Sequence, residues 1–169
     1  MKKILLVAVN AKYIHSNLAV YSLRAAARAY ADQIEITEYT INQQPDQVLG
    51  DIYRRQPDVV AFSCYIWNGE MIGELLQELP KVLPSAELWV GGPEVSYDAP
   101  EFLKHYPKVR GVMRAEGERS FPRLASYYIE ETGSLDQISG ITYREKTGEL
   151  RENPWAEPVN MDEIPFAYE

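Results

Sequence analysis

The feature that most constrains the fold is a regular alternation of short apolar runs with segments in which apolar residues recur at helical spacing. The apolar runs are residues 3–9, 34–39, 58–64, 87–90 and 109–113. The helical segments are residues 16–31, 45–55, 68–82, 96–106 and 118–130. Five strand–helix pairs in succession predict an α/β domain, in which helices cover both faces of a five-stranded parallel sheet. Right-handed crossovers favour the flavodoxin-like strand order 2-1-3-4-5.

The pattern changes towards the C-terminus and divides the chain into three parts. We expect residues 1–135 to form the Rossmann-like domain. Residues 136–152 hold a strand-like run, a Lys-Thr-Gly turn and a short return, which predicts a small β-hairpin extension. Residues 153–169 carry three prolines and little periodicity, so we expect a linker that leads out of a longer chain.

The overall charge argues against two classes of partner. The 169 residues include 25 acidic and 17 basic ones, which gives a net charge of -8. Nucleic acids and anionic membranes both attract a basic surface. No apolar run approaches the roughly 18 residues that span a bilayer, and the run at residues 4–9 is short for a signal peptide. We therefore expect a cytoplasmic protein that binds neither nucleic acid nor membrane.

The chain has a single cysteine, Cys64, which lies in an apolar run. One thiol can form no disulfide within the chain, and it cannot hold an iron–sulfur cluster with thiolates of this chain alone. We expect Cys64 to be a buried structural thiol.

Loops follow four of the predicted strands, at residues 10–17, 65–68, 91–97 and 114–120, and three of the four have unusual polar or glycine content. In an open parallel sheet these loops share the edge at which ligands bind. None has the G-x-G-x-x-G or G-x-x-x-x-G-K-[ST] sequence, which disfavours those two kinds of nucleotide site. Gly91 and Gly92, followed by Pro93, allow close approach either by a ligand or by another part of the protein.

Candidate site residues lie in these loops, and each has two interpretations. His15 could ligate a metal or donate a proton, or it could help to cap the next helix and pack beside Tyr13. The Ser63 hydroxyl could bind a ligand or bond to neighbouring backbone. Glu116 and Glu118 could act as an acid–base pair or supply favourable charge at a helix start. The sequence contains no evident catalytic set, which favours a binding module over an enzyme that acts alone.

Six segments carry a resemblance that extends over nearly the whole chain. They are KKILLVAVN, PDVVAFSCYIWN, ELWVGGPEVSYDAPEFL, VRGVMRAEGERSFPRL, ISGITYRE and PVNMDEIPFAYE. In order and spacing they resemble the N-terminal cobalamin-binding domain of cobalamin-dependent radical S-adenosylmethionine (SAM) enzymes. The resemblance implies that the chain binds cobalamin and continues into a C-terminal radical SAM barrel, which holds an iron–sulfur cluster and SAM. The full enzyme would transfer a methyl group or rearrange a substrate, with no turnover from this chain alone.

The resemblance also implies where the cofactor lies. Cobalamin would sit at the carboxyl ends of the strands, with its nucleotide tail beside the sheet and the lower base displaced from cobalt. Ser63 and the Gly91-Gly92 pair would flank that tail. The complete set of expected cofactor-binding residues is His15, Ser63, Tyr65, Gly91, Gly92, Pro93, Glu116 and Gly117.

Two loops depart from the family pattern. Ala115 stands where the family usually has the first glycine of Gly-Glu-Gly-Glu. Related cobalamin domains use a D-x-H-x-x-G sequence whose histidine ligates cobalt, and residues 13–18 keep only the histidine, His15. Since a ligating histidine is usually oriented by a second group, His15 is a candidate cobalt ligand whose ligation stays open.

Other functions are compatible with the same predicted fold. The chain could be a non-catalytic flavodoxin-like interaction module, or a degenerate domain that has lost its cofactor. A phosphoacceptor module would need acidic residues after the first strand and an aspartate after the third. The chain has Asn10-Ala11-Lys12 and Ser63-Cys64 at these places, which disfavours a phosphoacceptor.

Overall fold

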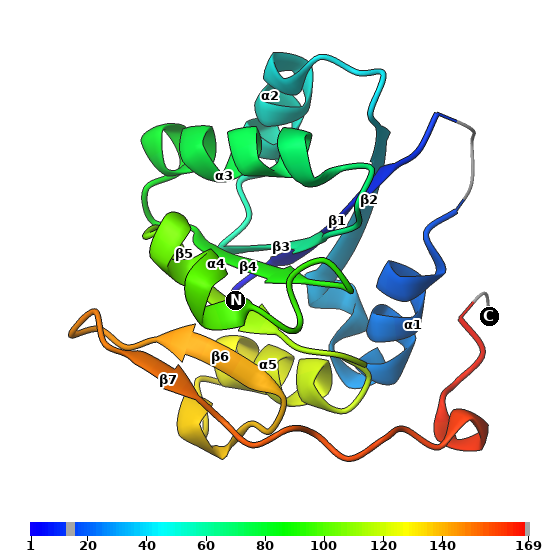
Figure 1. The fold of residues 1–169 in the computed structure, drawn as a ribbon. Helices are drawn as coiled ribbons and strands as arrows, with labels where there is room; N and C mark the ends of the chain where they lie inside the picture. The colour runs from blue at the N-terminus through cyan, green and yellow to red at the C-terminus, as the bar shows by residue number, and fades with distance from the viewer. Residues whose placement is uncertain (13–15, 168–169) are drawn as a thin grey trace.

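A largely parallel sheet forms the middle layer of the protein in the computed structural model, which describes residues 1–12 and 16–167 (Figure 1). The strands in that part of the chain are β1 (Ile4–Asn10), β2 (Ile34–Thr40), β3 (Val59–Ser63), β4 (Glu87–Gly91), β5 (Val109–Met113), β6 (Ile141–Arg144) and β7 (Leu150–Glu152). Their order is β2-β1-β3-β4-β5-β6-β7, and neighbours among β1 to β5 are parallel. The expected 2-1-3-4-5 order is confirmed.

The expected C-terminal hairpin is present, and it widens the sheet. β6 pairs antiparallel with β5, and β7 pairs antiparallel with β6. Over the described residues the sheet therefore has seven strands, two more than the parallel set. β6 starts at Ile141, directly after Gly140, which has a φ of +81°.

Helices cover both faces of the sheet, as expected. They are α1 (Leu18–Ala26), α2 (Pro45–Arg55), α3 (Gly69–Val82), α4 (Ala99–His105) and α5 (Ser120–Ile129), with short 3₁₀ helices η1 (Arg28–Gln33), η2 (Leu135–Gln137) and η3 (Met161–Glu163). Apolar residues of α2, α3 and α4 pack with Leu5 and Val7 of β1 on one face. Those of α1 and α5 pack with Ile4 and Leu6 on the other (Figure 1). Successive residues of β1 therefore contribute to two separate cores.

The single helix expected at residues 16–31 is wrong, because the structure has two elements there. α1 ends at Ala26 and η1 begins at Arg28; Ala27 between them has a ψ of 32° and a buried side chain. Both kinds of helix repeat apolar residues every three to four positions, and no glycine or proline marks the junction. None of the helices in the described residues combines the length and hydropathy needed to cross a membrane.

Asn68 occupies the cap position of α3 but makes no capping hydrogen bond through its side chain. Its amide donates to the carbonyls of Val9 and Ser63, both at 2.9 Å, and its side-chain oxygen accepts from the Tyr65 backbone N–H at 2.8 Å. These bonds satisfy backbone groups at the ends of β1 and β3. Asn68 therefore ties the loop after β3 to the end of β1.

A carboxylate on the edge strand β2 holds the start of α1 against the sheet. Glu38 accepts hydrogen bonds from the Asn17 backbone N–H at 2.7 Å, the Asn10 amide at 3.1 Å and the Tyr21 hydroxyl at 2.8 Å. Partial burial by itself would raise the pKa of Glu38, but the bonds from Asn17, Asn10 and Tyr21 outweigh it, so the pKa lies below its ordinary value.

We expect Glu38→Gln to lower the free energy of unfolding at pH 7 by about 1–2 kcal/mol, since it weakens charge-assisted hydrogen bonds. Because folding lowers the pKa of Glu38, the stabilisation is complete above the ordinary value of 4.5 and is lost as pH falls through the lowered folded value. Urea unfolding between pH 7 and pH 3 should show the difference shrinking on acidification. Glu74→Gln, at an exposed site on α3, is the control. A pH-independent difference would contradict this account.

Gly111 on β5 leaves room for the Trp89 ring. A Cβ at this position would overlap that ring and would lie 2.9 Å from the Thr142 carbonyl oxygen. We expect Gly111→Ala to destabilise the protein by about 1–3 kcal/mol through overpacking. The matched control is Gly69→Ala at the start of α3, where nothing lies within 4 Å of an added Cβ. Equal chemical-denaturation midpoints for the two variants would refute the packing argument.

Candidate functional site

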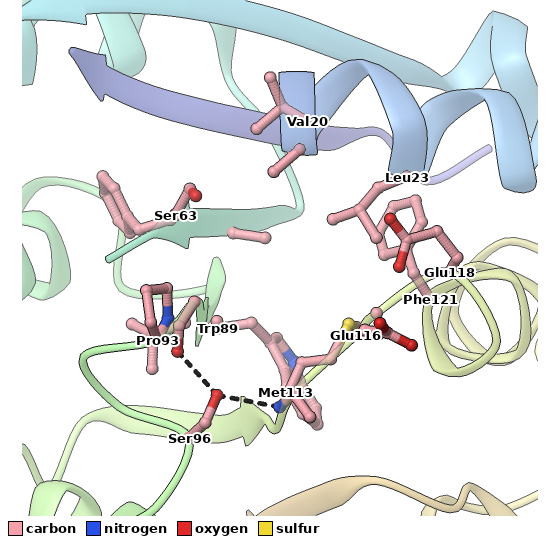
Figure 2. A pocket seen from close by; sticks show the side chains of 18 of the residues that line it. Val20, Leu23, Ser63, Trp89, Pro93, Ser96, Met113, Glu116, Glu118 and Phe121 are labelled. Atoms are coloured by element: carbon pink, nitrogen blue, oxygen red, sulfur yellow. Dashed lines mark hydrogen bonds between the residues drawn. The ribbon is translucent and has the colours of Figure 1, made fainter. Parts of the chain in front are cut away.

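A cavity of about 590 Å³ opens among the loops at the carboxyl ends of the strands (Figure 2). It continues between the sheet and the helices α1 and α5, as far as side chains in the middle of the strands. The volume falls within the range of roughly 300–1,000 Å³ that is typical of small-molecule sites. We call this cavity the slot; its mouth lies among the loops, and its inner end lies at Leu6, Ala61 and Trp89.

The register of the sheet determines the floor of the slot. Alternate residues of a strand face the same side, and strand pairing places a row of residues towards α1 and α5: Ala8, Ser63, Gly91 and Met113. The next row inward is Leu6, Ala61, Trp89 and Gly111. Small residues therefore lie in the centre of the sheet, with Ser63 and Gly91 on the outer row and Ala61 on the inner row, and they leave space beneath the helices.

Apolar side chains from the two helices form the walls. Val20 and Leu23 come from α1, and Phe121 and Leu124 come from α5 (Figure 2). Ala61 retains partial exposure although it lies in the middle of a central strand, because the slot reaches it. The walls can therefore enclose a flat apolar group against the sheet.

Trp89 contributes the largest side chain to the inner end. Its indole N–H donates to the Tyr128 hydroxyl at 2.7 Å, and that hydroxyl donates to the Glu87 carboxylate. Burial raises the pKa of Tyr128 well above its ordinary value, and the Glu87 charge raises it further. The Trp89 donor is thus already occupied by a neutral tyrosine on the side away from the slot.

Seven of the eight predicted site residues line this one cavity. They are Ser63, Tyr65, Gly91, Gly92, Pro93, Glu116 and Gly117. The eighth, His15, lies outside the described residues. Their common position agrees with a shared ligand, and their individual binding roles stay predictions.

The two glycines after β4 have different roles. Gly91 contributes to the floor of the slot, next to Ser63. Gly92 has a φ of +107°, and a Cβ there would overlap the Cys64 carbonyl and lie 3.0 Å from the Cys64 backbone nitrogen. Close approach at Gly92 is therefore made by the protein itself.

Cys64 is a buried thiol on the opposite side of the sheet from the slot floor, as expected. Burial raises the pKa of Cys64 to about 12, and the charge of Glu94 adds to the increase. The thiol therefore stays protonated and unreactive. Its backbone nitrogen donates to the Gly91 carbonyl at 2.7 Å, which extends the pairing of β3 and β4.

Two serines beside the slot differ in their hydrogen bonds. The Ser63 hydroxyl makes no hydrogen bond to any described residue. Its second interpretation, a hydrogen bond to neighbouring backbone, therefore does not hold within the described residues. The Ser96 hydroxyl donates to the Gly92 carbonyl at 2.7 Å and accepts from the Ala115 N–H at 2.9 Å (Figure 2). Ser96 therefore joins the loops after β4 and β5, and Asp98 occupies the cap position of α4.

The two glutamates around Gly117 do not form an acid–base pair with each other. Glu116 accepts from the Val159 backbone N–H at 3.0 Å, and Glu118 accepts from the Ser22 hydroxyl on α1 at 2.9 Å. The first turn of α5 contains no acidic residue, so neither glutamate supplies the helix-start charge that the second interpretation required. Each carboxylate thus joins the loop after β5 to a neighbouring segment, Glu116 to the segment after β7 and Glu118 to α1.

The segment that follows β7 packs against the domain at the mouth of the slot. The buried Arg114 donates to the Asn153 carbonyl and, at 3.2 Å, to Glu152, and its guanidinium lies 4.4 Å from the centre of the Trp155 ring. Burial lowers the pKa of Arg114, and Glu152 opposes that change. Residues 156–158 line the slot. The three prolines of residues 153–169, which led us to expect a linker, give no indication of these contacts.

Exposed aromatic residues stand beside the same mouth. The Tyr65 and Trp67 rings stack with centroids 4.4 Å apart, and the Trp67 indole donates to the Val9 carbonyl at 3.2 Å. The Tyr97 ring lies 5.9 Å from Trp155. Within residues 1–12 and 16–167, no group of three or more His, Cys, Asp or Glu side chains is arranged to hold a metal ion.

This arrangement suits a flat, mainly apolar group that enters from the carboxyl edge and lies between the sheet and the two helices. The Ser63 hydroxyl provides one donor on the floor for a polar atom of that group. A benzimidazole nucleotide, which is the tail of cobalamin, has this combination of an apolar ring system and polar linkage. The residues present therefore fit the cofactor that the sequence suggested.

Comparison with known proteins also indicates cobalamin as the ligand. The model of the B12 binding domain family matches residues 4–125. The cobalamin-dependent radical SAM methyltransferase TokK of Streptomyces tokunonensis is 27% identical over 92 residues, which are 54% of this chain and 14% of TokK. The 4'-phospho-dehydrooxetanocin synthase of Priestia megaterium is 25% identical over 138 residues, which are 79% of this chain and 18% of the synthase.

A solved structure shares the fold. The cobalamin-dependent SAM radical enzyme OxsB, with aqua-cobalamin and SAM bound, superposes with a TM-score of 0.76 at 19% identity, over 98% of this chain and 24% of OxsB. This chain spans less than a fifth of each of the two curated relatives. Because the family match includes all five parallel strands, α1 and most of α5, the chain belongs to the B12-binding domain family, and its cofactor is cobalamin.

Proposed function

We propose that this chain is the cobalamin-holding part of a cobalamin-dependent radical SAM enzyme that transfers a methyl group. The observation that carries the proposal is the slot, because small residues on its floor leave room for a ligand between the sheet and the helices α1 and α5. The similarity to the radical SAM methyltransferase TokK and the fold shared with OxsB support this enzyme class. The iron–sulfur cluster and SAM would be held by another part of the polypeptide.

In this proposal the slot receives the nucleotide tail of cobalamin. The lower base lies between the sheet and the walls from α1 and α5, and the Ser63 hydroxyl donates a hydrogen bond to a nitrogen or oxygen of the tail. Gly91, beside Ser63, keeps the floor free of a side chain. When bound, cobalamin supplies cobalt chemistry that can carry a methyl group.

The loops at the mouth would contact the rest of the cofactor. Tyr65, Pro93, Glu116 and Gly117 line the mouth. Hydrogen bonds within the protein position Tyr65, Glu116 and Gly117. Their role is to orient the bound molecule and exclude water from it. His15, in the loop before α1, stays a candidate cobalt ligand. Absorption spectra of bound cobalamin decide this point, because ligation requires the His15→Ala spectrum to differ from that of the wild type.

We expect the chain to bind hydroxocobalamin, and Ala61→Leu to weaken that binding at least about tenfold, because leucine would fill the inner end of the slot. Affinity is measured by absorbance or fluorescence titration. Cobinamide, which lacks the nucleotide tail, should bind both proteins equally. Ala29→Leu, at an exposed site on η1, is the matched control. Wild-type affinity in Ala61→Leu would refute the tail position, and a failure of the wild type to bind hydroxocobalamin at high micromolar concentration would count against the proposed function.

A further inference from the structure

The inner end of the slot is apolar on each described side. Its residues are Leu6, Val20, Ala61, Trp89, Phe121 and Leu124. The only side-chain donor among them, the Trp89 indole N–H, is used by Tyr128. The backbone of Leu6, Ala61 and Trp89 belongs to the paired ladders of β1, β3 and β4.

No unsatisfied polar atom compensates for this apolar character. Buried side-chain atoms without a partner, among the described residues, belong to Arg110, Arg114, Thr142 and Arg144, and none of these residues lines the slot. The Ser63 hydroxyl lies one row closer to the mouth than Ala61. Along the floor of the slot, polarity therefore changes from one available hydroxyl on the outer row to none on the inner row. The carboxylates of Glu116 and Glu118, which also line the slot, accept hydrogen bonds from the Val159 N–H and the Ser22 hydroxyl.

The chemistry of corrinoid tails makes this gradient selective. In 5,6-dimethylbenzimidazole the six-membered ring is a hydrocarbon with two methyl groups. In adenine the corresponding ring has two nitrogens and an exocyclic amine, all of which bond to water. Burial of such groups without partners costs free energy, whereas the methyl groups gain from it.

Building on the proposed cofactor site, we propose that the inner end of the slot selects corrinoids by their lower base, accepting dimethylbenzimidazole and rejecting adenine. Leu6, Phe121 and Leu124 offer the adenine amine and ring nitrogens no acceptor or donor. The selectivity resides in the tail and not in the corrin ring, so it is independent of the chemistry at cobalt. Ala61 determines this selectivity, because its small side chain faces the lower base from the floor of the inner row.

The test compares three corrinoids with the whole chain: cobalamin, the analogue with adenine as lower base, and cobinamide. Dissociation constants come from quenching of tryptophan fluorescence. We expect the adenine analogue to bind about 10–100-fold more weakly than cobalamin. Equal affinity for cobalamin and the adenine analogue would overturn the inference while leaving cobalamin binding intact. Binding of none of the three would instead overturn the proposed function.

A variant locates the source of the selectivity. Ala61→Ser adds a hydroxyl to the inner row and should reduce the affinity ratio between cobalamin and the adenine analogue at least about threefold. Ala29→Ser, at an exposed site on η1, makes the same chemical change away from the slot and should leave the ratio unchanged. Far-ultraviolet circular dichroism and thermal melting establish that both variants are folded. An unaltered ratio in folded Ala61→Ser would overturn the assignment of selectivity to the inner row.

Discussion

The slot depends on one constraint, the register of the parallel sheet. Pairing of β3 with β4 sets Ser63 beside Gly91 and Ala61 beside Trp89 on the face towards α1 and α5. A shift by one residue would reverse the faces and present Val60 and Phe62 to these helices. The helices would then have large side chains to pack against, and no space would remain. The register of β3 and β4 therefore creates the cavity, because it places Ser63, Gly91 and Ala61 on the face that α1 and α5 cover.

The surrounding contacts keep this space open at one end. Glu38 fixes the beginning of α1, Glu118 joins α1 to the loop before α5 through Ser22, and Ser96 links the loops after β4 and β5. Gly92 lets the loop after β4 pack against the backbone of β3. These contacts are internal to the protein, so the chain's own side chains and backbone determine the shape of the described part of the mouth.

Sequence patterns predicted the parts of the fold that depend on local periodicity. Strand order, the hairpin and the burial of Cys64 followed from apolar runs and turn residues. The gathering of seven candidate residues around one cavity followed from their positions at the ends of strands, and their binding roles stay predictions. The end of α1 at Ala26 could not be predicted, because a 3₁₀ helix continues the same apolar spacing. The hydrogen bonds of the Asn68 and Ser96 side chains could not be predicted either, because only tertiary structure brings their backbone partners within reach.

The segment after β7 packs against the mouth of the slot. Arg114, itself buried, holds this segment by a hydrogen bond to the Asn153 carbonyl and by its contact with the Trp155 ring. Residues 156–158 then form part of the mouth, and the Val159 N–H bonds to Glu116. In the proposed enzyme, a barrel attached beyond this segment is tethered beside the opening through which cobalamin enters. In that proposal, the contacts that complete the mouth would also hold the start of the connection to the barrel close to the cofactor.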